Sequence, residues 1–337
     1  SAATASTRQE VARDVQVAYF RYRTAQQQVE ILQATLRRVE ESLRTSKRLV
    51  SADRATPDVA FRAEAEVLAV RQRLEEAQAG QRQARSALNL LLDRPLGTEI
   101  PEPRLTAAEL VERRLASVLG AQAATPDRPG SGTSLPSLPD LQQTAGSTRP
   151  ELRQLSQSLE ATRDQRRAAQ THYLPTVALV LEGGIQGTAY AVDDEARFGL
   201  ASVVLQWNLF NGFCDQARIE QADLAAREIN IRRESVQRQI DLQVQQALDD
   251  VRVAQRSLET ANARKQAAES SFRLTKRRYD VGRANLVTFT DAQAALTEAD
   301  LNLTVTRFGL LTRLAELEFA TGQFATGQFA NDTLSGR

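Results

Sequence analysis

The 337-residue sequence contains few of the side chains that build cross-links, metal sites or enzyme active sites. It has one cysteine, one histidine and no methionine, and aromatic residues account for only 5% of it. A single cysteine excludes an intrachain disulfide. His172 and Cys214 are far apart in the sequence, so they do not suggest a shared metal site. We therefore expect neither a metal ion nor a cofactor.

The sequence also lacks features that mark other classes of protein. The formal net charge is only +1, with basic and acidic residues interspersed, which gives no reason to expect a nucleic-acid partner. The sequence contains no P-loop, G-x-G-x-x-G, G-x-S-x-G or H-E-x-x-H pattern, so an enzyme is not expected. It has no run of 18 apolar residues, and we therefore expect no transmembrane helix. It begins with Ser1 and lacks the pattern of a signal peptide, which predicts that an N-terminal segment has been lost.

An internal repeat dominates what the sequence does contain. Residues near its start recur in the same order near its end, without a gap: Ala18 pairs with Ala247 and Ala55 with Ala284, an offset of 229. In both copies apolar residues recur alternately every three and four positions, and only Lys265 in the second copy breaks the pattern. A period of 3.5 sustained over many turns predicts long helices that pack by knobs into holes.

Each copy is predicted to be a helical hairpin. In the first copy (residues 1–95) the chain turns near Ser51 to Asp58, where Pro57 cannot continue a helix interior. In the second copy (residues 213–322) the turn is at 281–285, where Gly282 is free to take a positive φ. The helix before this second turn contains no Pro or Gly and could reach roughly 100 Å at about 1.5 Å per residue.

The segment between the two hairpins has a different composition. Residues 96–147 combine a proline-rich start, a short helix opened by a capping box at Thr106 to Glu109, and a stretch rich in Pro, Gly, Ser and Thr that is expected to be an exposed linker. A second capping box at Thr148 to Glu151 is expected to open a helix within residues 148–173. Residues 323–337 form a C-terminal tail.

Within residues 174–212 the apolar period changes to two. Alternation in residues 176–189 and 198–209 predicts the two strands of a β-hairpin, each long enough to span a bilayer. Tyr190 and Trp207 lie toward strand ends, where aromatic residues are expected at a membrane interface. A soluble, half-buried sheet is the alternative for each strand. Because a lone two-stranded hairpin is unstable, these strands need partners from other chains or from residues outside this sequence.

Six short motifs, taken with the repeat, resemble the TolC-like outer membrane efflux protein family over nearly the whole chain. In chain order they are Arg149-Pro150-Glu151-Leu152, Leu174-Pro175-Thr176-Val177, Gln206-Trp207-Asn208-Leu209-Phe210-Asn211-Gly212, Tyr279-Asp280-Val281-Gly282, Asp291-Ala292-Gln293 with Leu296, and Leu317-Glu318-Phe319-Ala320-Thr321-Gly322.

The resemblance implies a mainly α fold with a β-hairpin, in which a homotrimer forms a hollow α-barrel of long helices and shares a transmembrane β-barrel. Such a protein is an exit duct in the outer membrane of a Gram-negative bacterium, surrounded there by outer membrane lipid and extending far into the periplasm. Its implied partners are a periplasmic adaptor and an inner-membrane transporter of the ABC, RND or MFS type, in efflux or type I secretion. Residues 96–147 would occupy the equatorial position. The family has a further β-hairpin before the first repeat, so we expect a preceding segment.

The resemblance also implies a gate at the helical tips. In the family, carboxylates on the second hairpin narrow the periplasmic entrance; the matching positions are Thr288 and Asp291, of which only Asp291 keeps the carboxylate. Three copies of Asp291 would attract cations at a narrow mouth. Asp58 is a candidate counterpart in the first repeat. The alternatives are a solvated Asp291 stabilised by the helix macrodipole and a capping role for Asp58.

The tips themselves would contact the adaptor. The residues concerned are Arg54 and Ala55 in the first turn and Gly282, Arg283 and Ala284 in the second. The arginines at the tips, which include Arg277 and Arg278, either pair across helices, bind acidic residues of the adaptor, or are ordinary surface charge.

Two points stay open at this stage. Trp207 and Phe210 are expected at the membrane interface, and a packing cluster at the strand-to-helix junction is the equal alternative. The main rival function is a periplasmic coiled-coil adaptor or spacer without a pore of its own. The cargo, whether a drug, a metal ion or a protein toxin, is not specified by the sequence.

Overall fold

The computed structural model describes residues 2–101, 105–120, 136–185, 197–281 and 283–323. The chain divides into two compact units, residues 1–150 with 239–337 and residues 151–238. The first unit contains α1 (Ala2–Ser51), α2 (Pro57–Leu91), α3 (Ala107–Gly120), α4 (Leu138–Thr148), α7 (Leu286–Ala320) and the C-terminal part of α6 (Cys214–Asp280). The second contains α5 (Pro150–Thr171), β1 (Thr176–Ile185), β2 (Arg197–Gln206) and the start of α6.

The predicted repeat is confirmed by the bounds of the helices. α1 ends at Ser51 and α6 at Asp280, α2 begins at Pro57 and α7 at Leu286, and α2 ends at Leu91 and α7 at Ala320. Each of these pairs is separated by the offset of 229 seen in the sequence. The two helical hairpins therefore share one backbone plan.

The hydrogen bonds that close the helix ends are also the same in the two repeats. The amide of Arg54 donates to the carbonyl oxygen of Leu49 at 2.8 Å, and the amide of Arg283 donates to that of Arg278 at 2.7 Å. These are six-residue Schellman closures, which place the preceding residue in the left-handed region, and Asp53 has a φ of 55° there. The ends of α2 and α7 close in the same way, with Asp93 (φ 52°) and Gly322 (φ 68°) at equivalent positions.

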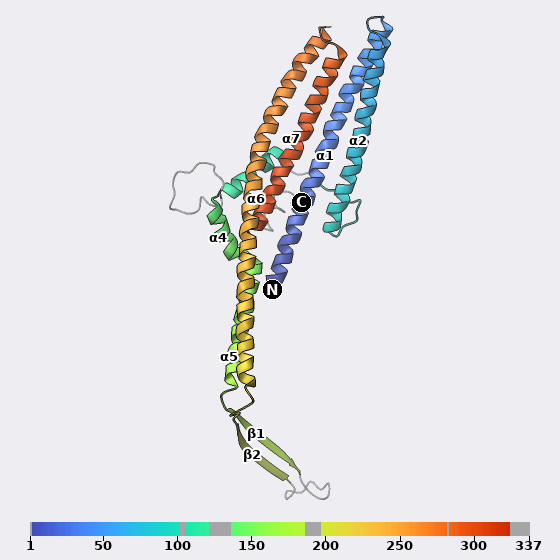
Figure 1. Cartoon of the computed structure of the whole chain (residues 1–337). Helices are drawn as coiled ribbons and strands as arrows, with labels where there is room; N and C mark the ends of the chain where they lie inside the picture. Colours follow the sequence, from blue (N-terminus) through green and yellow to red (C-terminus); the bar gives the residue numbers. More distant parts are fainter. Residues whose placement is uncertain (1, 102–104, 121–135, 186–196, 282, 324–337) are drawn as a thin grey trace. The chain divides into compact units, whose positions relative to one another are not determined.

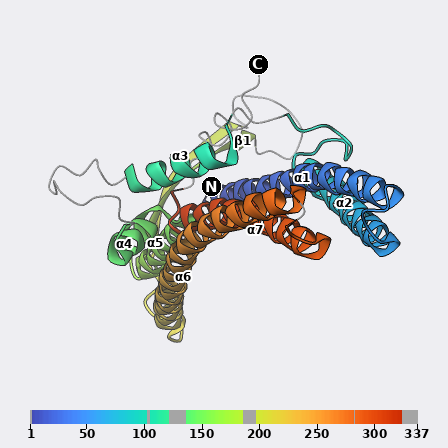
Figure 2. The same ribbon diagram turned by 90° about the horizontal axis from the view of Figure 1, so that it is seen from above.

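Four helices of the first unit form a layer in the order α6, α7, α1, α2 (Figure 1). α1 packs against both α2 and α7. Seen from above, α3 lies on one side of this layer, and it packs against α7 (Figure 2). Along α1 and α2 the interface is aliphatic: one cluster is formed by Val29, Leu32 and Leu74, and a second by Val39, Val67 and Val70. Alternating large aliphatic side chains of this kind exclude water from a helix–helix seam.

The seam between α6 and α7 is more polar. The apolar residues predicted to face inward on α6, from Ile240 to Phe272, are all buried or half-buried, so that prediction is confirmed. Lys265, which breaks the pattern, pairs with Asp300 of α7 at 3.0 Å. Two further ion pairs cross the same seam, Arg264–Glu298 at 2.8 Å and Arg313–Asp250 at 3.2 Å.

One of the two predicted capping boxes is present. The amide of Thr106 donates to Glu109 Oε2 at 2.8 Å, and the amide of Glu109 donates to Thr106 Oγ1 at 3.3 Å. The hydrogen bond from the backbone of Thr106 holds the pKa of Glu109 below its ordinary value.

The second predicted capping box is wrong. Thr148 is the last residue of α4, a helix that lies inside the stretch expected to be a linker. Its hydroxyl donates to the carbonyl oxygens of Thr144 and Thr321 instead of capping α5. The expectation of a linker is therefore also wrong for Leu138–Thr148. Ser137 caps this helix, because its Oγ accepts a hydrogen bond from the amide of Asp140, and Leu141 and Ala145 are buried.

The second unit carries the predicted β-hairpin. β1 and β2 pair antiparallel, with Thr176 opposite Gln206 and Ile185 opposite Arg197. β2 ends three residues before the predicted Leu209, and the predicted end of the first strand at Ala189 lies outside the described residues. One face carries Val177, Leu179, Leu181, Val203 and Leu205, each 64–71% exposed. Among the described residues, no helix combines the length and the apolar character needed to cross a membrane.

Candidate functional site

The two helical turns form one end of the first unit, which we call the tip and define as residues 47–62 and 276–291. A small apolar core holds the two turns together: Ala63, Leu286 and Phe289 are buried, and Leu43, Val59, Phe272 and Tyr279 pack against them. The ring of Phe289 stacks on that of Tyr279 with centroids 4.7 Å apart. All four long helices contribute to this core, so the positions of the two turns depend on each other.

Asn285 fixes the start of α7. Its Oδ1 accepts hydrogen bonds from both the amide and the hydroxyl of Thr288, each at 2.8 Å. Thr288, one of the two positions of the expected gate, is exposed, and its hydroxyl is already engaged in this cap. The matching N-cap of α2, Thr56, makes no side-chain cap bond.

Asp291 lies one turn further along α7 and is exposed. Within the described part of the chain, no hydrogen bond or ion pair engages its carboxylate, which leaves the carboxylate available to solvent or to an ion. The repeat places Arg62 at the position equivalent to Asp291 and Val287 at the position equivalent to Asp58. Asp58 lies in the first turn of α2, where its charge suits the helix dipole, and its role as a counterpart of Asp291 stays a prediction.

The other residues expected at the tip take similar places in the two turns. Arg54 and Arg283 are exposed, and Ala55 and Ala284 are half-buried behind them. Gly282 lies outside the described residues.

A second group of contacts, at the C-terminal end of α7, was not expected from the sequence as a site. Arg114 of α3 donates from Nη1 to both carboxylate oxygens of Glu318, at 2.8 and 2.9 Å, and from Nη2 to Gln16 Oε1 at 3.2 Å. The side chains of Arg114 and Glu318 are only 9% and 17% exposed, so this ion pair is largely removed from water. A buried pair of this kind fixes α3 against α7, because either charge alone would be costly there.

Arginines also surround the next residue, Phe319. The guanidinium carbons of Arg13 and Arg149 lie 4.4 and 5.0 Å from the centroid of its ring, within the range of cation–π contacts. Arg149 further donates to the carbonyl oxygen of Phe319 at 2.9 Å and to Gln243 Oε1 at 3.2 Å. A Cβ added to Gly322 would lie 2.8 Å from Thr148 Oγ1, so this approach requires glycine. Two of the motifs noted in the sequence, at residues 149–152 and 317–322, therefore meet in space.

In the second unit, aromatic side chains collect where the strands end. The indole N–H of Trp207 donates to the carbonyl oxygen of Tyr173 at 3.2 Å. The rings of Phe210 and Phe213 meet edge to face with centroids 5.6 Å apart. Phe210 and Phe213 pack on one another, and Trp207, Phe210 and Phe213 remain 59–74% exposed; a position of these residues at the membrane interface stays a prediction. Tyr190 lies outside the described residues.

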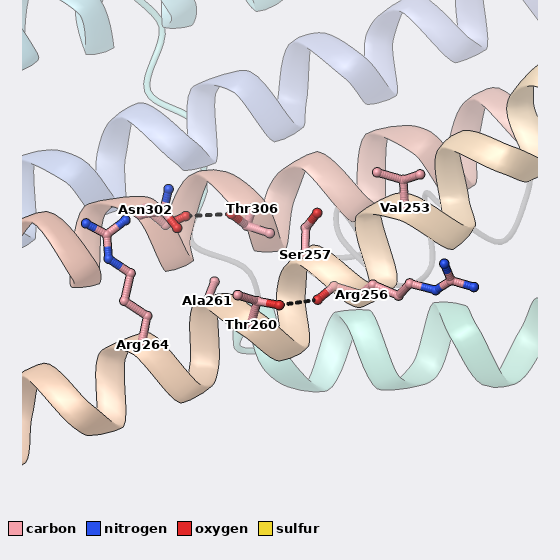
Figure 3. A pocket seen from close by; sticks show the side chains of 8 residues that line it. All are labelled: Val253, Arg256, Ser257, Thr260, Ala261, Arg264, Asn302 and Thr306. Atoms are coloured by element: carbon pink, nitrogen blue, oxygen red, sulfur yellow. Dashed lines mark hydrogen bonds between the residues drawn. The ribbon is translucent and has the colours of Figure 1, made fainter.

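Between α6 and α7 there is a groove of about 490 Å³. It is lined by Val253, Arg256, Ser257, Thr260, Ala261, Arg264, Asn302 and Thr306 (Figure 3). These side chains are small or hydroxylated apart from the two arginines, so they do not fill the space between the helices. The groove holds no group of acidic, histidine or cysteine ligands, and the described residues contain no such group of three or more elsewhere.

Comparison with known proteins now identifies the architecture. The model of the outer membrane efflux protein family matches residues 141–323, which is more than half of the chain. The chain belongs to this family. Membership of the outer membrane efflux protein family places the chain in the cell outer membrane, and the matched region includes the β-hairpin, α6, α7 and the contact between Arg149 and Phe319.

Individual relatives agree with this assignment. The chain is similar to the outer membrane protein TolC of Salmonella enteritidis, with 28% identity over 180 residues, and to TolC of Escherichia coli strain K12, with 28% identity over 183 residues. Each match covers 50% of this chain and 36% of the relative, so the matched part spans about a third of the length of these curated proteins. The open state of the MtrE outer membrane channel of Neisseria gonorrhoeae has the same fold, with a TM-score of 0.74 at 19% identity over 95% of this chain and 68% of that one.

Proposed function

We propose that this chain is one protomer of a homotrimeric exit duct that carries cargo across the periplasm and the outer membrane without acting on it chemically. The observation that carries the proposal is the family match over residues 141–323. A duct needs no catalytic residues, because an inner-membrane transporter supplies the energy. The proposed partners are that transporter, of the ABC, RND or MFS type, and a periplasmic adaptor, in efflux or type I secretion in a Gram-negative bacterium.

The order of the long helices supports a closed ring of copies. α2 and α6 are the outer helices of the layer, and both carry exposed apolar residues: Phe61 and Leu68 on α2 are 69% and 57% exposed, and Leu274 on α6 is 52% exposed. When two different edges of one chain meet head to tail, repetition of the contact closes a ring if the rotation permits. We infer that α2 of one copy covers α6 of the next, which would enclose a helical duct.

The β-hairpin supports the membrane end of the proposal. Apolar side chains on the face that contains Leu179 and Leu205 have no partner within the described chain, and exposed aromatic residues follow at the strand ends. Lipid and the hairpins of other copies are the proposed covering of this surface. The shared barrel and the trimer follow from the family likeness and remain part of the proposal.

We assign Asp291 to the periplasmic mouth of the duct. Its free, exposed carboxylate near the start of α7 would be repeated three times around a trimer, where it would attract cations. Thr288 contributes no charge, so α7 would supply a single ring of carboxylates. Asp58, in the first turn of α2 at the same tip, would add a second carboxylate per chain.

Single-channel conductance in planar bilayers tests the duct and its mouth together. Wild-type full chain is compared with Asp291→Asn and with Asp53→Asn, which removes a carboxylate from the same tip at a position that asparagine also tolerates. We expect stable openings in all three and reduced cation preference in Asp291→Asn alone. Equal selectivity in all three would remove Asp291 from the mouth. The absence of openings from folded, detergent-extracted protein would favour a periplasmic adaptor or spacer without a pore.

A further inference from the structure

The groove between α6 and α7 has the side chains of an anion-binding site. Arg256 and Arg264 lie at its two ends, eight residues and about 12 Å apart along α6 (Figure 3). None of the eight lining residues carries a carboxylate. Arginine binds carboxylates and phosphates through its planar set of N–H donors, so two arginines with no acid in the lining favour an anionic occupant.

The groups between the two arginines add hydrogen-bond acceptors and further donors. The hydroxyl of Thr260 donates to the carbonyl oxygen of Arg256 at 3.0 Å (Figure 3). In the same way, the hydroxyl of Thr306 donates to the carbonyl oxygen of Asn302 at 2.8 Å. Because these two hydroxyl hydrogens are engaged, the hydroxyl oxygens are left to accept hydrogen bonds from a ligand. Ser257 and the side-chain amide of Asn302 can also donate. The groove therefore suits an organic anion that carries hydroxyl groups.

The two arginines differ in how far they are already engaged. Arg264 donates from Nη2 to Glu298 Oε1 at 2.8 Å, and both of these side chains are more than half exposed. Arg256 is exposed, and within the described part of the chain its guanidinium forms no ion pair. A ligand can therefore bind Arg256 without displacing a partner, whereas it must compete with Glu298 for Arg264.

The groove residues of α7 share one side of that helix with Asp291. Glu298 follows Asp291 by seven residues and Asn302 follows Glu298 by four, and both spacings return to the same helix face. Glu318, which pairs with Arg114 of α3, is sixteen residues beyond Asn302 and therefore lies about 160° further round the helix. The groove and α3 are thus on opposite sides of the layer (Figure 2). Because Asp291 is assigned to the mouth, the groove is assigned to the duct wall, roughly 16 Å further along α7.

We propose that the groove between α6 and α7 is a binding site on the duct wall for a small organic anion, one that carries carboxylate or phosphate groups beside hydroxyl groups. The inference rests on the proposed function, since it names a class of cargo that the duct would accept. A volume of about 490 Å³ is within the usual range for small-molecule sites. Most of the lining side chains are exposed, so binding should be weak, as passage through a duct requires.

Calorimetric titration with citrate tests the site. Citrate carries three carboxylates and a hydroxyl group, and tricarballylate, which has the three carboxylates without the hydroxyl, is the control ligand. Full-length protein in detergent is titrated with each at low and at high NaCl concentration. We expect citrate to bind more tightly than tricarballylate, because its hydroxyl can donate to the threonine oxygens. Both should bind more weakly at the higher salt concentration, since exposed charges are screened.

Substitutions along α6 and α7 locate the site. Arg256→Gln should weaken citrate binding at least about tenfold, because it removes charge-assisted hydrogen bonds. The matched control Arg273→Gln makes the same change at an exposed arginine further along α6, outside the groove, and should bind like wild type. Glu298→Gln releases Arg264 and should strengthen citrate binding by about threefold, a gain that misfolding would not produce. Circular dichroism verifies that all three variants are folded.

Three results would overturn the proposal: no binding of citrate by wild type, equal weakening by Arg256→Gln and Arg273→Gln, or equal affinities for citrate and tricarballylate. Conductance recorded on the same samples separates this inference from the function on which it rests. Citrate should reduce the open-channel current of wild type more than that of Arg256→Gln, which would support both. Conducting protein that does not bind citrate refutes the groove and retains the duct. A non-conducting wild type that binds citrate through Arg256 refutes the duct and retains the groove, and a current that bound citrate leaves unchanged overturns its place on the duct wall.

Discussion

The hairpin of α1 and α2 and the hairpin of α6 and α7 have one backbone plan and two different interiors. Their helices end at equivalent residues, and their turns close with the same hydrogen bonds, Arg54 to Leu49 and Arg283 to Arg278. Between the helices, however, the first has aliphatic clusters and an ion pair, Arg71–Glu40, whereas the second has, among the described residues, three ion pairs and an open groove in addition to its buried apolar residues. The backbone hydrogen bonds that close a helix end depend on a few local positions. The interface between two helices is a long surface, so its side chains can differ between the repeats while the helix ends stay the same.

The difference predicts unequal resistance to separation. Burial of aliphatic side chains at the α1–α2 seam contributes about 1.5–3 kcal/mol for each residue. Exposed ion pairs contribute about 0–1 kcal/mol each and weaken with salt. The stretch of the α6–α7 seam that contains these ion pairs should therefore open more readily at high salt than the aliphatic stretch of the α1–α2 seam.

The largest expected effect is in the aliphatic seam. Leu74→Ala removes a side chain that is 7% exposed and packed against Val29 and Leu32, so we expect the free energy of unfolding to fall by about 3 kcal/mol. Urea unfolding followed by circular dichroism measures it. Leu68→Ala on the same helix, at a residue 57% exposed, is the control and should change it by less than about 0.5 kcal/mol in the dissociated chain, where no second copy covers α2. A similar loss in both would mean that the two faces of α2 are equally buried.

The equivalent helix ends should respond differently. Gly322→Ala places a Cβ in the left-handed region and against Thr148 Oγ1, which should cost about 2 kcal/mol. At the equivalent position in the first repeat, Asp93→Gly relieves a left-handed non-glycine residue and should be neutral or slightly stabilising. Urea midpoints of the two variants give the comparison, and destabilisation by Asp93→Gly would contradict it.

The two N-caps offer a smaller contrast. Asn285→Ala removes a side chain that accepts two hydrogen bonds from Thr288, and it should cost about 1 kcal/mol. Thr56→Ala at the equivalent start of α2 removes no side-chain cap bond. It should lower the free energy of unfolding by only about 0.3 kcal/mol. Thermal unfolding of both variants measures the difference. If the cap stabilises this turn, Asn285→Ala must lower the unfolding temperature more than Thr56→Ala does.

The smallest effect concerns the ion pairs. Glu298→Gln breaks the ion pair with Arg264. The side chains of Glu298 and Arg264 are 70% and 52% exposed, so we expect the free energy of unfolding to fall by about 0.5 kcal/mol at low salt. In 1 M NaCl the difference from wild type should vanish, because the screening length there is about 3 Å. A loss that persists at high salt would mean that the seam is drier than the exposure of these side chains indicates.

The sequence predicted those features that depend on local pattern. The seam of α6 and the Thr106 capping box could be derived from spacing, because each is determined by residues within a few turns of one another. The repeat could be recognised because the same local pattern recurs at an offset of 229. Even α4 has a local signal, since Ser137 and Asp140 form the start of a helix; the surrounding prolines and glycines concealed it.

The contacts at the end of α7 could not be predicted in this way. Arg13, Arg114 and Arg149 approach Glu318 and Phe319 from three other segments of the chain, and no periodicity relates them. Thr148 was mispredicted for the same reason. Its sequence fits a capping box, but its hydroxyl donates a hydrogen bond to the carbonyl oxygen of Thr321, a tertiary contact that local spacing does not reveal. The roles of Asp291 at the mouth and of the tip arginines remain predictions, since they depend on copies and partners outside one chain.

The apolar face of the β-hairpin also constrains how the protein can be made. Before assembly, the side chains of Val177, Leu179 and Val203 face water, and both strand edges are open, with no further strand in the described chain. Uncovered edges with apolar faces template pairing with any similar chain, which leads to aggregation. A newly synthesised protomer therefore has a short time in which to find its partners or a chaperone, and its yield on refolding should depend on the presence of detergent or lipid from the start.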